Sequence, residues 1–188
     1  PPPGPTPAGT MTAPRLVFPG RPRHLARRFV GSLRPGGPSS TEEAWAIGYL
    51  LAGEADLWRS MSGADRRHAV AVARRVDRAL GSPERPVLAA ALLHDVGKVR
   101  SGLGTPGRVV ATVVGVVAAD RAARWATSDG LRGRIGRCLR HPQEGAALLE
   151  TAGSDPLTVA WATEHHRDPG RWTVDDRLAE VLRAADDD

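Results

Sequence analysis

The sequence contains very little cysteine and no long apolar stretch. Its single cysteine, Cys138, allows no intrachain disulfide, and one thiolate cannot build a structural zinc site of several cysteines. The longest largely apolar run, residues 109–119, has 11 residues, whereas a helix that spans a bilayer needs about 20. No apolar segment near the start resembles a secretory signal. We therefore expect a cytoplasmic protein without a membrane span.

Lysine is nearly absent from the chain, and acidic residues are absent from its first part. Lys98 is the only lysine among 26 basic residues, and residues 1–40 contain six arginines but no acid. The remaining chain therefore has a net charge of −1, so the basic character belongs to the first 40 residues. Ten of the 16 prolines lie there as well, and proline cannot donate a backbone hydrogen bond. We predict a disordered Pro/Gly/Arg-rich tail at residues 1–40, with partners among nucleic acids, anionic surfaces or proteins.

From residue 41 onward, apolar residues recur at the three- and four-residue spacing of helices. Thr41 precedes the first such segment, a second opens near Ala64, and the nearly all-apolar Val87–Val96 predicts a buried central helix. Residues 108–126 are rich in valine, which also suits a strand, but a length of about 18 residues favours a helix. Further helices are predicted at residues 131–139, 142–152, 156–166 and from 174 to the end. The sequence thus predicts an all-α protein, with a single helical bundle at residues 41–188.

Several polar residues lie where this pattern places the core. His68 continues the inward face of its predicted helix, and His165 and Asp186 do the same at the ends of theirs. One buried histidine is usually a hydrogen-bonded core residue. Several on separate helices are harder to explain this way, because burying an unpaired imidazole or carboxylate costs several kcal/mol unless protons or a metal compensate. A shared metal site would remove that cost for all of them.

The most informative stretch is His94-Asp95-Val96-Gly97-Lys98, which closes the apolar central helix. An adjacent imidazole and carboxylate at this place indicates a bound cation. Neighbours on a helix point about 100° apart, so one of the two side chains must reach sideways. The only lysine of the chain follows three residues after the carboxylate, which indicates a chemical role. The alternative for Lys98 is a solvated cation that complements the helix dipole.

Together these residues resemble the H…HD…D signature of the HD-domain metal-dependent phosphohydrolases, which have an all-helical fold. The signature residues are His68, His94, Asp95 and Asp186. The stretch that ends in Lys98 has the more specific form HDxGK. His141 and the doublet His165-His166 resemble the branch that carries two metals, which includes the HDIG and HD-GYP groups. No Gly-Tyr-Pro follows the doublet, and the only tyrosine is Tyr49, which weakens the case for cyclic di-GMP as the substrate.

The resemblance implies two groups of metal ligands that share one carboxylate. The first ion would be held by His68, His94, Asp95 and Asp186, and the second by Asp95, His141 and His165 or His166. For His166, a contact with substrate and a plain surface position stay open. The ions would be divalent iron, manganese, zinc or nickel, since the donors are imidazoles and carboxylates without thiolates. Asp187 or Asp188 could replace Asp186, although helical phase favours Asp186.

The resemblance also implies an activity. The chain would hydrolyse a nucleotide or another small phosphomonoester or phosphodiester with a metal-activated water. Asp95 would bridge the two ions, and Lys98 would stabilise negative charge on the phosphate oxygens. The alternative is an inactive HD-type regulatory module that binds a nucleotide or metal and recruits a partner through its basic tail. Retention of all seven ligand positions favours the enzyme.

Overall fold

The computed structural model describes residues 36–104, 107, 110, 111, 113–115, 122 and 124–187. All regular structure in these parts of the chain is helical, so the predicted all-α class is confirmed. The helices are α2 (Ser40–Ile47), α3 (Ala52–Ser60), α4 (Gly63–Leu80), α5 (Arg85–Leu93), η1 (Val96–Ser101), η2 (Arg124–Thr127), α7 (Gly130–Leu139), α8 (His141–Thr151), α9 (Pro156–Glu164) and α10 (Asp176–Asp187). Residues 1–35 lie outside the described part, so for them the disordered tail stays a prediction. Ser39 and Ser40, which the prediction places in that tail, cap and begin α2.

Short polar side chains set where the first helices begin. Ser39 caps α2 by accepting from the amide of Glu42, and the Glu42 carboxylate accepts from the Ser39 amide at 2.8 Å. The capping residue therefore lies two residues before the predicted Thr41, which is inside α2. Ser62 caps α4 in the same way, with its hydroxyl accepting from the Asp65 amide at 3.2 Å. In both helices the serine hydroxyl satisfies an amide that a helix leaves without an internal acceptor, and in α2 the pair of bonds is reciprocal.

The first predicted helical segment is divided into two helices. α2 ends at Ile47 and α3 begins at Ala52, with Leu51 in an extended conformation between them. Glu54 folds back to accept from the Leu51 amide at 2.8 Å, and Arg85 donates to the same carboxylate at 3.0 Å. Because the Glu54 side chain is completely buried, this ion pair fixes α3 against the start of α5.

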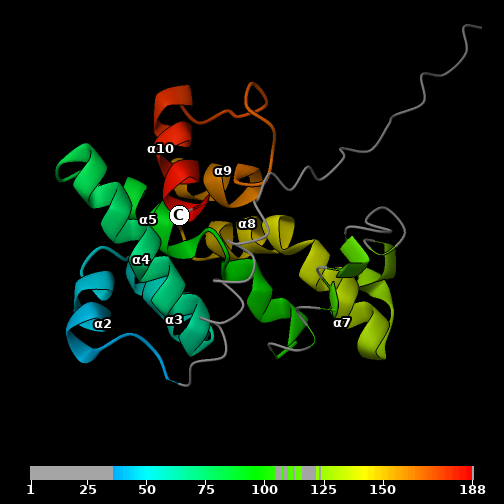
Figure 1. Cartoon of the computed structure of the whole chain (residues 1–188). Helices are drawn as coiled ribbons and strands as arrows, with labels where there is room; N and C mark the ends of the chain where they lie inside the picture. The colour runs from blue at the N-terminus through cyan, green and yellow to red at the C-terminus, as the bar shows by residue number, and fades with distance from the viewer. Residues whose placement is uncertain are drawn as a thin grey trace, which may run out of the picture.

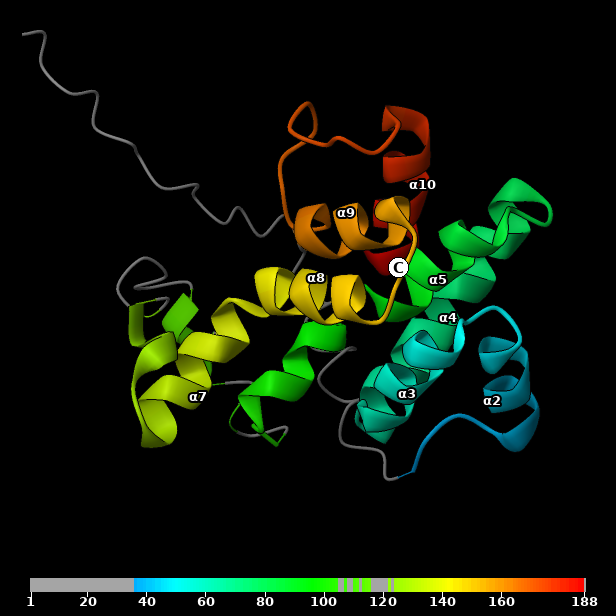
Figure 2. The ribbon, with the colours of Figure 1, turned by 180° about the vertical axis from the view of Figure 1, so that it is seen from behind.

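α5 is the central helix, as predicted. Its residues from Leu88 to Leu93 are fully buried, and they pack in one core with apolar residues of α4, α8, α9 and α10. Figures 1 and 2 show α5 enclosed between α4 and α9, with the end of α10 lying over it. α5 ends at Leu93, three residues earlier than predicted, and η1 then runs towards α8. The centre of the bundle therefore contains a helix junction.

A second, smaller core lies beside α7. It contains Leu103, Ala111, Ile135 and Cys138, and in both views α7 lies at the opposite end of the molecule from α2. In the predicted helix 108–126, the described residues 110, 111, 113–115 and 122 are helical, so these residues do not form a strand, and residues 124–126 belong to η2. No helix in the described parts of the chain is long and apolar enough to cross a membrane.

Two arginines join α7 to the end of η1. Arg134 donates to the carbonyl of Ser101 at 3.2 Å, and Arg137 donates to that of Arg100 at 3.1 Å. Both carbonyls lie at the C-terminal end of η1, where the last carbonyl groups of a helix have no intrahelical donor. These side chains therefore hold the smaller core in place next to the junction.

Candidate metal centre

His94 and Asp95 occupy the junction between α5 and η1. His94 is the residue that closes α5, and Asp95 follows with φ −99° and ψ 6°, a conformation between helix and turn. The two side chains are therefore freed from the 100° offset of neighbours on one helix, and both reach the same cluster. They are 1% and 4% exposed. The prediction that the pair lies within the last turn of a helix is wrong, because the helix ends one residue before it.

Three of the clustered histidines are oriented by the same kind of hydrogen bond. The Nδ1 atoms of His94, His141 and His165 each donate to a carbonyl three residues earlier in the chain. The acceptors are Ala91, Cys138 and Ala162, at 2.9, 2.8 and 2.9 Å. These carbonyls lie in the last turns of α5, α7 and α9, where acceptors lack an intrahelical partner. A carbonyl can only accept, so each Nδ1 carries a proton, and each Nε2 is left as the ligand atom.

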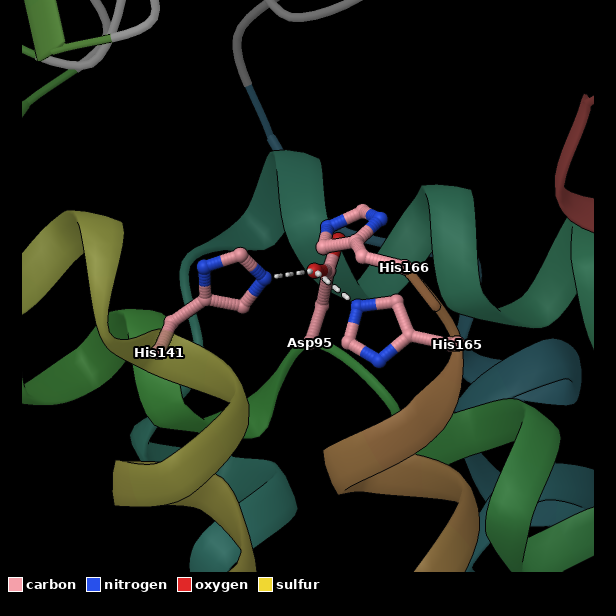
Figure 3. Close-up of side chains that lie close together, drawn as sticks. All are labelled: Asp95, His141, His165 and His166. Carbon is pink, nitrogen blue, oxygen red and sulfur yellow. Dashed lines mark ion pairs between the residues drawn. The ribbon is translucent and has the colours of Figure 1, made fainter. Parts of the chain in front are cut away.

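The three Nε2 atoms converge on Asp95, as Figure 3 shows for His141 and His165. The Nε2 of His141 lies 3.3 Å and that of His165 lies 3.7 Å from Oδ1 of Asp95. The Nε2 of His94 lies 3.4 Å from the other oxygen, Oδ2. All three nitrogens are buried and make no hydrogen bond within the described structure. A cation among them would remove the cost of this burial.

The carboxylate of Asp95 separates two sets of ligand atoms. Oδ1 faces the histidines of α8 and of the end of α9, while Oδ2 faces His94. The ammonium of Lys98 pairs with Oδ2. Because each oxygen has its own neighbours, the carboxylate can serve two cations at once.

The first set contains the residues predicted for the first ion. One ligand atom each from His68, His94 and Asp95 lies within 4.8 Å of the others. Asp186 joins them from α10, with its Oδ1 2.8 Å from Nε2 of His68 and 3.5 Å from Nε2 of His94. The neighbouring Asp187 is exposed and lies 3.7 Å from Arg183 instead. Asp186, which the helical phase favoured over Asp187, is thus the buried carboxylate that lies beside the two histidines.

The second set also includes both members of the histidine doublet. Ligand atoms of Asp95, His141, His165 and His166 lie within 4.8 Å of one another. The ring of His166 lies with its centroid 4.0 Å from that of His165 and 5.1 Å from that of His141. α9 ends at Glu164, so the doublet follows the helix and both rings can turn towards Asp95 (Figure 3).

Burial and charge set the protonation of the site. Burial lowers the pKa of His94, but the carboxylates of Asp95 and Asp186 outweigh it and raise that pKa to about 10. Burial raises the pKa of Asp95, but Lys98 and His94 hold it well below its usual value. Without a metal, a proton on His94 therefore supplies positive charge between two carboxylates.

The histidine doublet has the opposite electrostatic character. Burial lowers the pKa of His165 to about 4. Burial, with help from His165 and His141, also holds the pKa of His166 well below its usual range. Both imidazoles are therefore neutral near pH 7, which is the form that binds metals.

No role was assigned from the sequence to two features of the site. Gly97 and Gly145 meet where η1 crosses α8. Their sequence signal is that Gly97 belongs to the HDxGK stretch and that Gly145 follows His141 by four residues. Glu164 is 3% exposed and accepts from the amide of Thr173 at 2.7 Å and from its hydroxyl at 2.9 Å. It thus fixes the chain that follows the histidine doublet.

The donor set fits divalent metal ions. It consists of imidazole nitrogens and carboxylate oxygens, which suit zinc, iron, manganese or nickel, and the three Nε2 atoms facing Asp95 need a partner. The HD domain family model matches residues 67–187, a range that includes every residue of both sets. No curated protein and no solved structure matches the chain significantly.

Proposed function

The chain belongs to the HD-domain family, and from this premise we propose that it is a metal-dependent phosphohydrolase acting on a nucleotide or another small phosphoester. The proposal rests above all on one observation. Three buried Nε2 atoms, each fixed by a carbonyl behind its ring, face the two oxygens of Asp95. The histidine doublet supports the two-metal branch related to the HDIG and HD-GYP groups, without the Gly-Tyr-Pro motif.

Both ligand groups take part in the proposal. His68, His94, Asp95 and Asp186 would hold one ion, and Asp95, His141, His165 and His166 would hold the other. Asp95 is common to both because its two oxygens face different histidines. When bound, two divalent cations would supply a water of lowered pKa as the nucleophile and would neutralise charge on the phosphoryl group.

Lys98 would contact the substrate. Its side chain is 22% exposed, whereas that of Asp95 is 4% exposed, so the ammonium is the part of the pair that reaches solvent. In the metal-free protein it compensates the buried carboxylate. With cations present that compensation is no longer needed, and the ammonium can bind a phosphate oxygen as a compact point charge.

The test compares bound metal with hydrolysis in one set of proteins. Protein purified without chelator should carry about two equivalents of a divalent transition metal, and it should hydrolyse a nitrophenyl phosphodiester or members of a nucleotide panel. Asp95→Asn and His94→Ala should lose both properties. His24→Ala, which changes the one histidine outside the family match, should lose neither.

The outcomes separate the enzyme from its alternative. Bound metal with no turnover across the panel would favour an inactive module that binds a nucleotide or metal. Absence of bound metal under reducing, chelator-free conditions would refute the metal centre itself. A cytoplasmic location and the partners of residues 1–40 stay predictions from the sequence.

A further inference from the structure

Gly97 lies directly against the first turn of α8. A Cβ atom added to it would lie 1.9 Å from the carbonyl oxygen of His141 and 2.5 Å from the amide nitrogen of Gly145. Real Cβ atoms essentially never approach another heavy atom closer than 3.0 Å. Both contacting atoms belong to backbone, which cannot swing aside as a flexible side chain can. No residue larger than glycine therefore fits at this position unless η1 and α8 move apart.

Gly145 faces Gly97 from the other side of the same contact. A Cβ there would lie 3.2 Å from the amide nitrogen of Gly97 and 3.5 Å from Cγ1 of Val96. Neither glycine has a positive φ. Space rather than backbone conformation is therefore the reason for glycine at both places, and position 97 is the tighter of the two.

This contact joins the two sides of the second ligand set. Gly97 follows Asp95 by two residues, and His141 is the first residue of α8. The Nε2 of His141 lies 3.3 Å from Oδ1 of Asp95, so a movement of α8 away from η1 changes the separation of these ligands directly. His94, His68 from α4 and Asp186 from α10 do not contribute atoms to this contact.

We infer that Gly97 is a positioning residue that brings His141 within reach of Asp95 and thereby allows the site to hold two cations rather than one. The inference rests on the proposed function. Relief of the clash from 1.9 Å to at least 3.0 Å requires the backbones to separate by about 1 Å. Metal–ligand distances tolerate only about 0.2 Å, so such a shift is large enough to remove His141 from a coordination sphere.

The experiment measures metal stoichiometry rather than turnover. Wild type, Gly97→Ala and Leu149→Ala are loaded with Mn²⁺, dialysed and analysed for metal content and by electron paramagnetic resonance. Leu149 is fully buried in α8 and lies in the main core, so Leu149→Ala controls for general destabilisation of the same helix. We expect about two ions and a coupled spectrum for wild type and Leu149→Ala, but about one ion and an isolated Mn²⁺ spectrum for Gly97→Ala.

The outcomes distinguish the inference from the function on which it rests. Fewer than two ions in wild type would overturn the two-metal centre together with the inference. Two ions in wild type and in Gly97→Ala, with equal affinity, would overturn the inference alone, as would a folded Gly97→Ala that binds none. If Gly97→Ala does not fold, the affinity of Gly145→Ala for the second ion tests the inference instead. Gly145→Ala should weaken binding of the second ion by about tenfold, and an unchanged affinity would refute the role of the contact.

Discussion

The Lys98 ammonium pairs with Oδ2 of Asp95, the oxygen that also faces His94. The lysine thus occupies the side of the carboxylate that belongs to the first ligand set. The chain contains 25 arginines and this one lysine, and the lysine lies at the candidate metal centre. An arginine guanidinium is planar and suits two acceptor oxygens side by side, whereas this place offers one carboxylate oxygen beside an imidazole.

Replacement of Lys98 should therefore reduce turnover without removing metal. Lys98→Met should lower kcat/KM about 10²-fold or more, because it removes the positive charge that we propose to bind the phosphate oxygens. Lys98→Arg should also have a lowered kcat/KM, since the charge of a guanidinium is spread over a larger group than that of an ammonium. Metal analysis and steady-state kinetics on the same preparations test this. Full activity in Lys98→Met would assign the lysine to stability alone.

The adjacent acids at the end of α10 offer a matched comparison. Asp186→Asn should weaken binding of the first ion by about 10- to 100-fold, because its carboxylate lies 2.8 Å from His68 and 3.5 Å from His94. Asp187→Asn should leave metal affinity unchanged, since that side chain is exposed and faces Arg183. Competition with a fluorescent chelator measures both affinities. Equal effects of the two substitutions would contradict the assigned phase of α10.

Helical periodicity was enough to predict some of these positions. His68 and Asp186 lie within regular helices, where a residue's face follows from its spacing to apolar neighbours. The same rule could not place His166, because it assumes a helix and α9 ends at Glu164. Beyond that end the offset of 100° no longer applies, and His166 turns into the cluster with His165.

Other features depend on how separate helices pack, which spacing along one chain does not reveal. The division between α2 and α3 depends on Glu54, whose buried carboxylate bonds Leu51 nearby but also Arg85, 31 residues away. The glycine at position 97 was visible in the sequence, but its cause lies in the backbone of α8. Helical periodicity thus predicted the all-α class, and the motif named residues that lie together in the described structure. The junction that brings them together could be seen only in the three-dimensional contacts.

Glu164 should contribute to stability next to the site. It is buried and accepts from Thr173, Val174 and Arg167, so truncation leaves several donors without a partner. Glu164→Ala should lower the free energy of unfolding by about 3 kcal/mol. Urea denaturation of the metal-free protein measures the change. Glu150→Ala, which removes an exposed carboxylate from α8, should change it by less than about 0.5 kcal/mol, and a similar loss in both would contradict the role of the buried contacts.

Two truncations test how the first part of the chain relates to the helical domain. A protein of residues 36–188 keeps Ser39, which caps α2. It also keeps Gly36, whose backbone packs closely on the start of α4: a Cβ added to Gly63 would lie 2.6 Å from the Gly36 carbonyl oxygen. This shorter protein should keep both hydrolysis and the unfolding free energy of the whole chain. Removal of residues 1–41 also deletes the cap and should cost about 1 kcal/mol of stability while leaving kcat/KM unchanged, because α2 contributes no ligand to either set. Loss of hydrolysis on removing residues 1–35 alone would show that the arginine-rich segment takes part in catalysis or substrate binding, and the boundary between tail and domain would then have to be abandoned.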